Sequence, residues 1–303
     1  MQNSIITEQD IIQAGNIELL ANQVVEGFIT GLHKSPYHGF SVEFAEHRQY
    51  NTGESTRYID WKLYAKTDKL FVKRFDEETN LRCQLILDVS KSMYVPAEGL
   101  SKIKFSAVAI ASIAVLLKKQ RDAAGITLID DEIVFNSMPK LSTLNQKHIF
   151  EQLTKALTDN KLDYKKGNLS KNLHLLADKI HKRSMVIIFS DCFEDNIDEL
   201  INALYHLKYN KHDVVLFHVM DKQLEDDFDL PNRPLLLVDS ETGNKIKIHT
   251  NAVKEQYLFN MRAFKKSLKL KCAQYKIDYI EAVVGNNFDS ILYKFYVKRG
   301  KLM

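Results

Sequence analysis

From about Leu81 onward, short apolar runs alternate with segments of helical periodicity. The strand-like runs are Cys83–Leu87, Ile126–Ile129, Ile133–Phe135, Met185–Phe189, Val214–Val219 and Asp278–Val284. The helical segments are Lys102–Lys119, Asn145–Thr158, Lys171–Lys182, Ile197–Tyr209, Ala252–Tyr275 and Phe288–Lys298. Alternating strands and helices predict the α/β class, with an open, mostly parallel sheet and helices on both faces. The Ile126–Phe135 hairpin adds one antiparallel strand, and Asp221–Asn251 is predicted to be an irregular, acidic excursion.

The chain before Leu81 has a different character. Glu8–Lys34 has helical spacing, and Ser35–Gly39 ends that pattern with a proline and a glycine. Phe40–Thr79 is irregular, charged and aromatic, and Leu70–Phe75 within it predicts one short strand. We therefore expect residues 1–80 to form an N-terminal helix and an irregular segment that packs on a main domain of residues 81–303.

The charge balance argues against a nucleic-acid-binding protein. The chain has 42 basic and 39 acidic residues, a net charge of +3, and its basic residues are mixed with acids. The two most basic stretches, Lys161–Lys171 and Lys265–Lys271, also contain apolar residues. We interpret both stretches as solvated helix faces.

Cysteine usage and hydropathy indicate a cytoplasmic protein. The three cysteines are far apart and form neither a disulfide framework nor a pair with metal-ligand spacing: Cys83, Cys192 and Cys272. No run approaches ~18 apolar residues, so no transmembrane helix is expected. Met1–Asp10 lacks the basic region of a secretory signal. We therefore expect no membrane insertion.

Acidic residues follow three of the predicted strands: Asp88, Asp191 and Asp221. The first begins Asp88-Val89-Ser90-Lys91-Ser92, which places a carboxylate and two hydroxyls on one turn. Ligands bind beyond the carboxyl ends of parallel strands, and hard oxygen ligands suit Mg²⁺. The alternative is that these are ordinary turn and capping residues, and that alternative is strongest for Asp221.

Other catalytic motifs are absent from the sequence. There is no P-loop and no Gly-x-Ser-x-Gly elbow, and neither serine has an evident general base. A nucleophilic Asp88 would need a second acid two residues on, where Ser90 stands. The histidines in or near helices and strands form no ligand motif: His174, His181, His206, His212 and His218. We therefore do not expect an enzyme.

Two motifs together resemble a known family. Asp88–Ser92 with Met93, followed by a buried helix and Ser190-Asp191, resembles a von Willebrand factor type A domain with a metal-ion-dependent adhesion site. The upstream segment Gly53–Trp61, with Lys66, Leu70–Lys73 and Glu77-Glu78, is similar to the signature of the domain-of-unknown-function-58 family. The resemblance covers roughly residues 38 to 220, and it implies a sheet of about six strands.

The resemblance also implies a metal site. Asp88, Ser90 and Ser92 would form its first loop, and Asp191 would be the acid of its last loop, often acting through water. The family pattern expects a threonine ligand at Gly167; Asn168 and Ser170 are oxygen donors close to that position. The implied Mg²⁺ site is therefore partly degenerate.

The family is linked to MoxR-type AAA+ ATPases, which implies a non-catalytic, protein-binding adaptor that engages the ATPase or its client. Ala252–Tyr275 and Arg57–Trp61 could add contact surface, although Trp61, Tyr58 and Phe71 could equally pack the N-terminal segment onto the sheet. The alternative function is a Mg²⁺-dependent hydrolase of a phosphate or acyl substrate, with Asp88 and Asp191 holding the metal.

Overall fold

A computed structural model describes residues 16–33, 47–49, 61–73, 81–158, 167–194, 196–239, 242–285 and 288–300. The chain forms two compact units. Residues 1–28 and 81–303 make the larger unit, and residues 29–80 make the smaller one. The predicted packing of residues 1–80 on the main domain stays a prediction.

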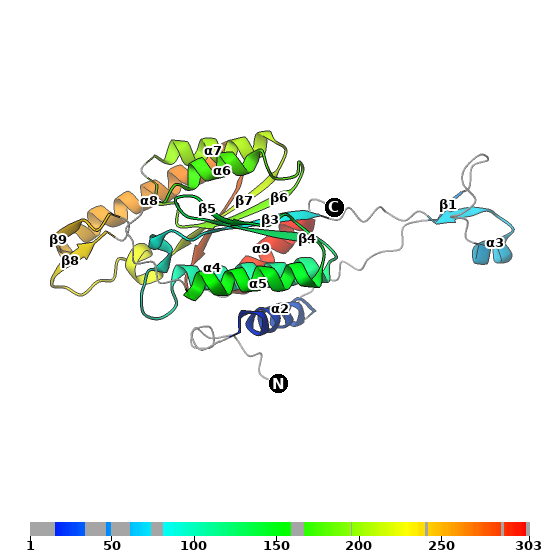
Figure 1. Cartoon of the computed structure of the whole chain (residues 1–303), viewed down its shortest axis with the longest axis horizontal. Coiled ribbons are helices and arrows are strands. Elements are labelled where there is room, and N and C mark those ends of the chain that lie inside the picture. Colours follow the sequence, from blue (N-terminus) through cyan, green and yellow to red (C-terminus); the bar gives the residue numbers. More distant parts are fainter. Residues whose placement is uncertain are drawn as a thin grey trace. The chain divides into compact units, whose positions relative to one another are not determined.

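The core of the larger unit is a six-stranded sheet (Figure 1). Its strands are β3 (Arg82–Asp88), β4 (Ala123–Ile129), β5 (Ile133–Asn136), β6 (Met185–Ser190), β7 (Asp213–Met220) and β10 (Asp278–Val283). Their order is β10-β7-β6-β3-β4-β5. Only β5 is antiparallel to its neighbour. The predicted fold class and the Ile126–Phe135 hairpin are therefore confirmed.

The strand order reverses at β3. After β3 the chain first builds β4 and β5 on one side of it, and then crosses to β6, β7 and β10 on the other. In parallel register, Leu87 of β3 lies opposite Phe189 of β6, and Ser190 lies opposite His218 of β7. The ends of β3 and β6 therefore meet at the switch point, where open sheets of this kind bind ligands.

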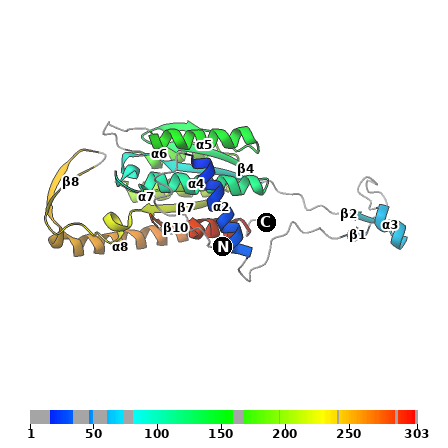
Figure 2. The ribbon, with the colours of Figure 1, turned by 90° about the horizontal axis from the view of Figure 1, so that it is seen from below.

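Helices cover both faces of the sheet (Figures 1 and 2). They are α4 (Lys102–Lys119), α5 (Thr143–Thr158) and α9 (Phe288–Gly300) on one face, with α6 (Leu169–Ala177) and α7 (Ile197–Tyr209) on the other. Almost every residue of α4 is buried, because α4 lies between the sheet and other helices. The prediction that this apolar helix is covered on a second side is confirmed.

Two further helices belong largely to this unit. In α2 (Ile17–His33), the side chains of residues 17, 20, 21, 24, 25 and 28 are buried, and the Phe28 ring meets the Tyr296 ring of α9 edge-on. The long helix α8 (Thr250–Gln274) precedes β10. Among the described helices, none has both the length and the apolar character needed to cross a membrane.

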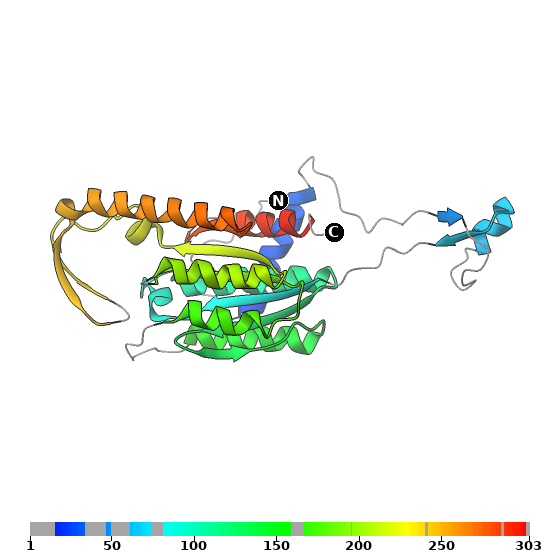
Figure 3. The ribbon, with the colours of Figure 1, turned by 90° about the horizontal axis from the view of Figure 1, so that it is seen from above.

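The prediction that Asp221–Asn251 is irregular is wrong. The segment contains the one-turn π-helix η3 (Lys222–Asp226) and an antiparallel hairpin of β8 (Pro234–Val238) and β9 (Lys245–His249). The hairpin lies at the N-terminal end of α8 (Figure 3). Leu235 and Leu237 pair with Ile248 and Ile246, so one face of the ribbon is apolar. Lys245 and Lys247 alternate with Ile246 and Ile248, so the period-2 pattern of a half-buried strand is present in the sequence.

A second correction concerns the predicted helix Lys171–Lys182, which ends at Ala177. The N–H groups of Lys179 and Ile180 both donate to the Leu176 carbonyl, which closes the last turn. That turn directs Ile180 into the core, where it is buried.

The smaller unit contains β1 (His47–Gln49), α3 (Trp61–Thr67) and β2 (Phe71–Lys73). β1 and β2 pair antiparallel, and β2 lies within the strand predicted at Leu70–Phe75. Trp61 is exposed and meets the Tyr64 ring edge-on. The motif residues 53–60 lie outside the described residues, so the contact surface predicted for Arg57–Trp61 stays a prediction.

Candidate functional site

Polar side chains gather where β3 and β6 end. We call Asp88, Ser90, Ser92, Ser190 and Asp191 the carboxyl-edge cluster. The Ser90 N–H donates to Asp88 Oδ1 (2.9 Å), and the Ser190 hydroxyl donates to Asp88 Oδ2 (2.6 Å). The Ser90 and Ser92 hydroxyl oxygens are 3.1 Å apart. The four residues predicted as metal ligands therefore lie together, because β3 and β6 are neighbours.

The Asp88 carboxyl group is buried with only 6% of the residue exposed. Burial and the nearby Asp191 charge raise its pKa to about 6, although hydrogen bonds from Ser190 and Ser90 oppose the shift. Two carboxylates are thus held close together in a poorly solvated place. A positive charge must compensate at least one of them.

Lys102, which the sequence analysis did not identify, supplies that charge. It is the first residue of α4, and only 1% of it is exposed. Its Nζ donates to Asp191 Oδ2 (2.8 Å) and to Glu225 Oε1 of η3 (2.5 Å). Burial acts to lower the pKa of Lys102, but the two carboxylates raise it above its usual value. In return, Lys102 holds the pKa of the buried Asp191 below its usual range.

A signal for Lys102 was present in the sequence. A positive charge in the first turn of a helix is unfavourable, because the N–H groups there carry partial positive charge. Lys102 also begins a helix whose buried residues are mostly apolar. A lysine at that position predicts a nearby carboxylate partner, although the sequence alone does not identify Asp191 and Glu225.

Asp221 has the ordinary turn role. Its Oδ1 accepts from the Leu224 N–H (2.7 Å) and caps η3. The acid that reaches the cluster from the end of β7 is Glu225, whose Oε2 also accepts from the Asp221 N–H (2.8 Å). Asp221, the acid predicted at the strand end, therefore caps the turn. Glu225, which comes later in the chain, is the acid that reaches the cluster.

A small cavity of about 10 Å³ opens beside the cluster. It is lined by Asp88, Ser90, Gly167, Leu169, Ser190, Phe193 and Glu194. Gly167, where the resemblance places a threonine ligand, contributes no side-chain oxygen. The neighbouring donors are engaged elsewhere: Asn168 Oδ1 accepts from the Lys171 N–H (3.0 Å), and Ser170 bonds Glu194 through its N–H (2.7 Å) and its hydroxyl.

Residues 46–267 match the family described as "Protein of unknown function DUF58". The chain belongs to the DUF58 family. The match covers most of the chain, so the resemblance seen in the sequence is confirmed, and it extends beyond residue 220 into α8.

Curated relatives of this DUF58 protein include "Uncharacterized protein Rv1480" of Mycobacterium tuberculosis and "Uncharacterized protein Mb1516" of Mycobacterium bovis. Each is 24% identical over 230 residues, which cover 75% of this chain and 69% of the relative.

Similar solved structures include the conserved hypothetical protein BatB from Bacteroides thetaiotaomicron, with 13% identity, a TM-score of 0.45, and coverage of 73% of this chain and 99% of that one. Another is the SpRpn10 VWA domain, with 11% identity, a TM-score of 0.35, and coverage of 71% and 95%.

The cluster does not fit the Mg²⁺ site that the resemblance implies, with Asp88, Ser90, Ser92, Asp191 and a threonine at position 167. Gly167 offers no ligand, and Asp191 is already paired with a buried ammonium group. The remaining donors are one carboxylate and two hydroxyls, a weak set for Mg²⁺. Within the described parts of the chain, no group of three or more His, Cys, Asp and Glu residues is arranged to hold a metal. Magnesium binding stays a prediction.

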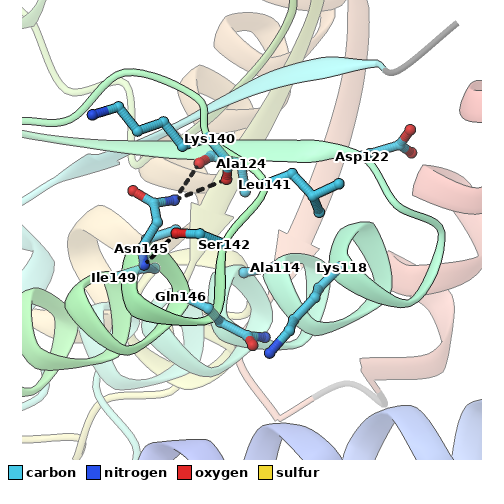
Figure 4. A pocket seen from close by; sticks show the side chains of 10 residues that line it. All are labelled: Ala114, Lys118, Asp122, Ala124, Lys140, Leu141, Ser142, Asn145, Gln146 and Ile149. Carbon is cyan, nitrogen blue, oxygen red and sulfur yellow. Dashed lines mark hydrogen bonds between the residues drawn. The ribbon is translucent and has the colours of Figure 1, made fainter.

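A second cavity of about 10 Å³ lies between α4, α5 and the start of β4 (Figure 4). Asn145 lines this cavity and makes three hydrogen bonds there. Its Nδ2 donates to the carbonyls of Ala124 (2.7 Å) and Lys140 (3.2 Å), and its N–H donates to Ser142 Oγ (3.0 Å). These bonds fasten the start of α5 to β4. The arrangement is a structural anchor with room for about one water molecule.

Proposed function

We propose that this DUF58 protein is a non-catalytic protein-binding module that contacts its partner through the carboxyl edge of the sheet. One observation carries this proposal. Phe193 lies beside the carboxyl-edge cluster with 42% of its side chain exposed, yet its ring is held in place. The Lys102 ammonium lies 5.3 Å from its centroid, and the Phe264 ring stacks at 6.3 Å.

An exposed aromatic ring with a fixed orientation is well suited to protein recognition. Aromatic residues dominate the energy of many interfaces, and a ring that is already ordered loses little entropy on binding. The polar groups of the cluster beside it bond mainly to one another, which favours a binding surface over a nucleophile with its base. Following the family resemblance, we propose a MoxR-type AAA+ ATPase or its client as the partner.

Truncating Phe193 tests the proposed contact. We expect Phe193→Ala to weaken binding to the purified MoxR-type ATPase at least ~10-fold, because a buried aromatic anchor typically contributes more than ~1.4 kcal/mol. The measurement is calorimetric titration in the ATP-bound, ADP-bound and nucleotide-free states. Leu144→Ala, which truncates an exposed apolar side chain on α5, is the matched control and should change the affinity less than about twofold.

Three results would contradict the proposal. The first is equal affinity of wild type and Phe193→Ala, and the second is no binding in any nucleotide state. The third is Mg²⁺-dependent turnover of p-nitrophenyl phosphate or p-nitrophenyl acetate that Asp88→Asn abolishes, which would favour the hydrolase alternative.

The outer face of α8 is a second proposed contact surface. Phe259 and Leu270 are 68% and 61% exposed there, and Arg262, Lys266 and Lys269 are exposed on the same helix. Residues 233–276 contain ten basic and three acidic residues, whereas the whole chain is nearly balanced. Phe259, Ala263, Leu270 and Ala273 follow helical heptad spacing, with Lys266 at the position between Ala263 and Leu270, which fits a narrow seam with one partner helix. Charge complementarity makes that helix acidic.

Reversing two of these charges tests the α8 surface. We expect Lys266→Glu/Lys269→Glu to weaken ATPase binding about 10-fold at 0.15 M salt and to flatten its salt dependence, because like charges then face the acidic helix. Lys179→Glu/Lys182→Glu carries the same charge change on exposed residues elsewhere and is the control. If both double variants weaken binding equally, only net charge matters and α8 is not a specific contact.

A further inference from the structure

Lys102 joins three separate segments at the carboxyl ends of the strands. Lys102 is in the first turn of α4. Its ammonium group donates hydrogen bonds to Asp191, which follows β6, and to Glu225 in the turn after β7. Asp191 is in turn tied to two neighbours, the Ser92 hydroxyl and the Phe193 N–H (3.3 Å). The loops that follow β3, β6 and β7 are thus fastened to one buried cation.

Such an arrangement has a high intrinsic cost. Removing an ammonium group from water is expensive, and the N-terminus of α4 adds a further unfavourable interaction with positive charge. The cost is offset only by charged partners at hydrogen-bond distance, and Lys102 has two of them. A side chain held this way has a specific electrostatic role, because an apolar residue of the same length would pack there without that cost.

We propose that the Lys102 ammonium is the resident cation of this edge, so that the three loops keep their arrangement without a divalent metal. The ammonium group stands 2.8 Å from the carboxylate that the family resemblance assigns to the metal. A dication on the same carboxylate would be repelled by it at short range in a poorly solvated place.

The remaining geometry agrees with this assignment. The Ser90 and Ser92 hydroxyls bond each other, and the Asp88 oxygens already accept two hydrogen bonds. None of these polar atoms is left without a partner where a metal ligand would be.

Titration of the full chain with Mg²⁺ and Mn²⁺ tests the assignment. For wild type we expect no saturable heat below 1 mM metal and a melting temperature that changes by less than about 1 °C between EDTA and 5 mM metal. Lys102→Met removes the ammonium group and leaves Asp191 and Glu225 uncompensated. We expect this variant to melt lower in EDTA and to regain about 5 °C or more with either metal.

Two further variants separate charge from packing. Lys102→Met/Asp191→Asn/Glu225→Gln removes all three charges and should show no response to metal. Lys104→Met, in the same turn of α4, removes a lysine whose Nζ donates to the Gly99 carbonyl (3.3 Å), and this variant should behave like wild type.

Two outcomes would overturn the assignment. The first is submillimolar Mg²⁺ binding by wild type that Asp88→Ala abolishes, which needs no Lys102 variant and so remains decisive even if Lys102→Met does not fold. The second is a Lys102→Met protein with wild-type stability and no metal response. Neither outcome changes the result expected for Phe193→Ala, so the binding proposal and the Lys102 proposal are tested independently.

Discussion

Replacing Gly125 with alanine is expected to lower the free energy of unfolding by about 2–3 kcal/mol. Gly125 lies inside β4, where a Cβ atom would come within 2.5 Å of the Ser137 carbonyl oxygen and 2.7 Å of the Pro139 nitrogen. Both are main-chain atoms, so they cannot move aside as the end of a flexible side chain can. The added methyl group must therefore displace the chain that follows β5.

The Gln84 side chain makes the displacement more costly. Its Oε1 would be 2.7 Å from the new Cβ, while its Nε2 donates to Thr127 Oγ1 (2.8 Å) and to the Ser137 carbonyl (3.1 Å). Moving Gln84 would break buried hydrogen bonds between β3, β4 and the end of β5. The loss should therefore appear as weakened attachment of β5, the strand at that side of the sheet.

Urea unfolding followed by circular dichroism measures this change. Gly27→Ala is the matched control, because a Cβ at that exposed position in α2 meets nothing within 4 Å. A helix gains up to about 1 kcal/mol from that substitution. Stability of Gly125→Ala within about 1 kcal/mol of wild type would mean that the approach of the Ser137 segment to β4 is not as close as the structure has it.

The fold was largely predictable, because four of its strands, β3, β4, β6 and β7, are buried on both faces. A strand such as Met185–Phe189 must be apolar throughout, and this distinguishes it from the periodic helices around it. The β8–β9 hairpin lacks that signal. Its strands are short and mostly exposed. The alternation of Lys245 and Lys247 with isoleucines is the period-2 signal of a half-buried strand, but the pairing of that strand with β8 is apparent only from the cross-strand partners.

The carboxyl-edge cluster was only partly predictable, for a related reason. Asp88 and Asp191 follow apolar strands, and neighbouring parallel strands bring their ends together. Glu225 reaches the cluster because of a π-helical turn, and Phe193 is positioned by contacts with other elements. Such geometry leaves no periodic trace in the sequence. Lys102 was partly predictable: its unusual position at the start of a mostly apolar helix is evident from the sequence, but its partners are not.

The free energy of unfolding is expected to fall as the pH is lowered, because His218 of β7 becomes protonated more readily in the unfolded chain than in the folded protein. This side chain is fully buried, its Nδ1 lies 2.7 Å from the Tyr279 hydroxyl, and its ring meets Phe264 at 5.8 Å. Burial lowers its pKa to about 4, aided by the charges of Lys102 and Lys265 and opposed by that of Asp191. The unfolded chain takes up a proton below the usual value of 6.5, whereas the folded protein resists protonation until about 4.

The unfolded state therefore binds more protons between these values. The stabilising contribution of neutral His218 is fully present above pH 6.5 and is lost as the pH falls toward 4. The full loss amounts to about 3 kcal/mol. Below pH 4 both states are protonated at this residue, and the contribution of His218 no longer changes.

Comparison with His218→Asn isolates this effect from the carboxylates that titrate in the same range. Asparagine offers the Tyr279 hydroxyl an acceptor but does not ionise, so the variant should start less stable at pH 7 because of the lost ring volume. Its deficit should then shrink by about 2–3 kcal/mol as the pH falls to 4. Urea unfolding at half-unit pH steps measures both curves, with His249→Gln, an exposed histidine, as the control. Parallel curves for wild type and His218→Asn would contradict the prediction, because they would mean that His218 is protonated equally readily in the folded and unfolded states.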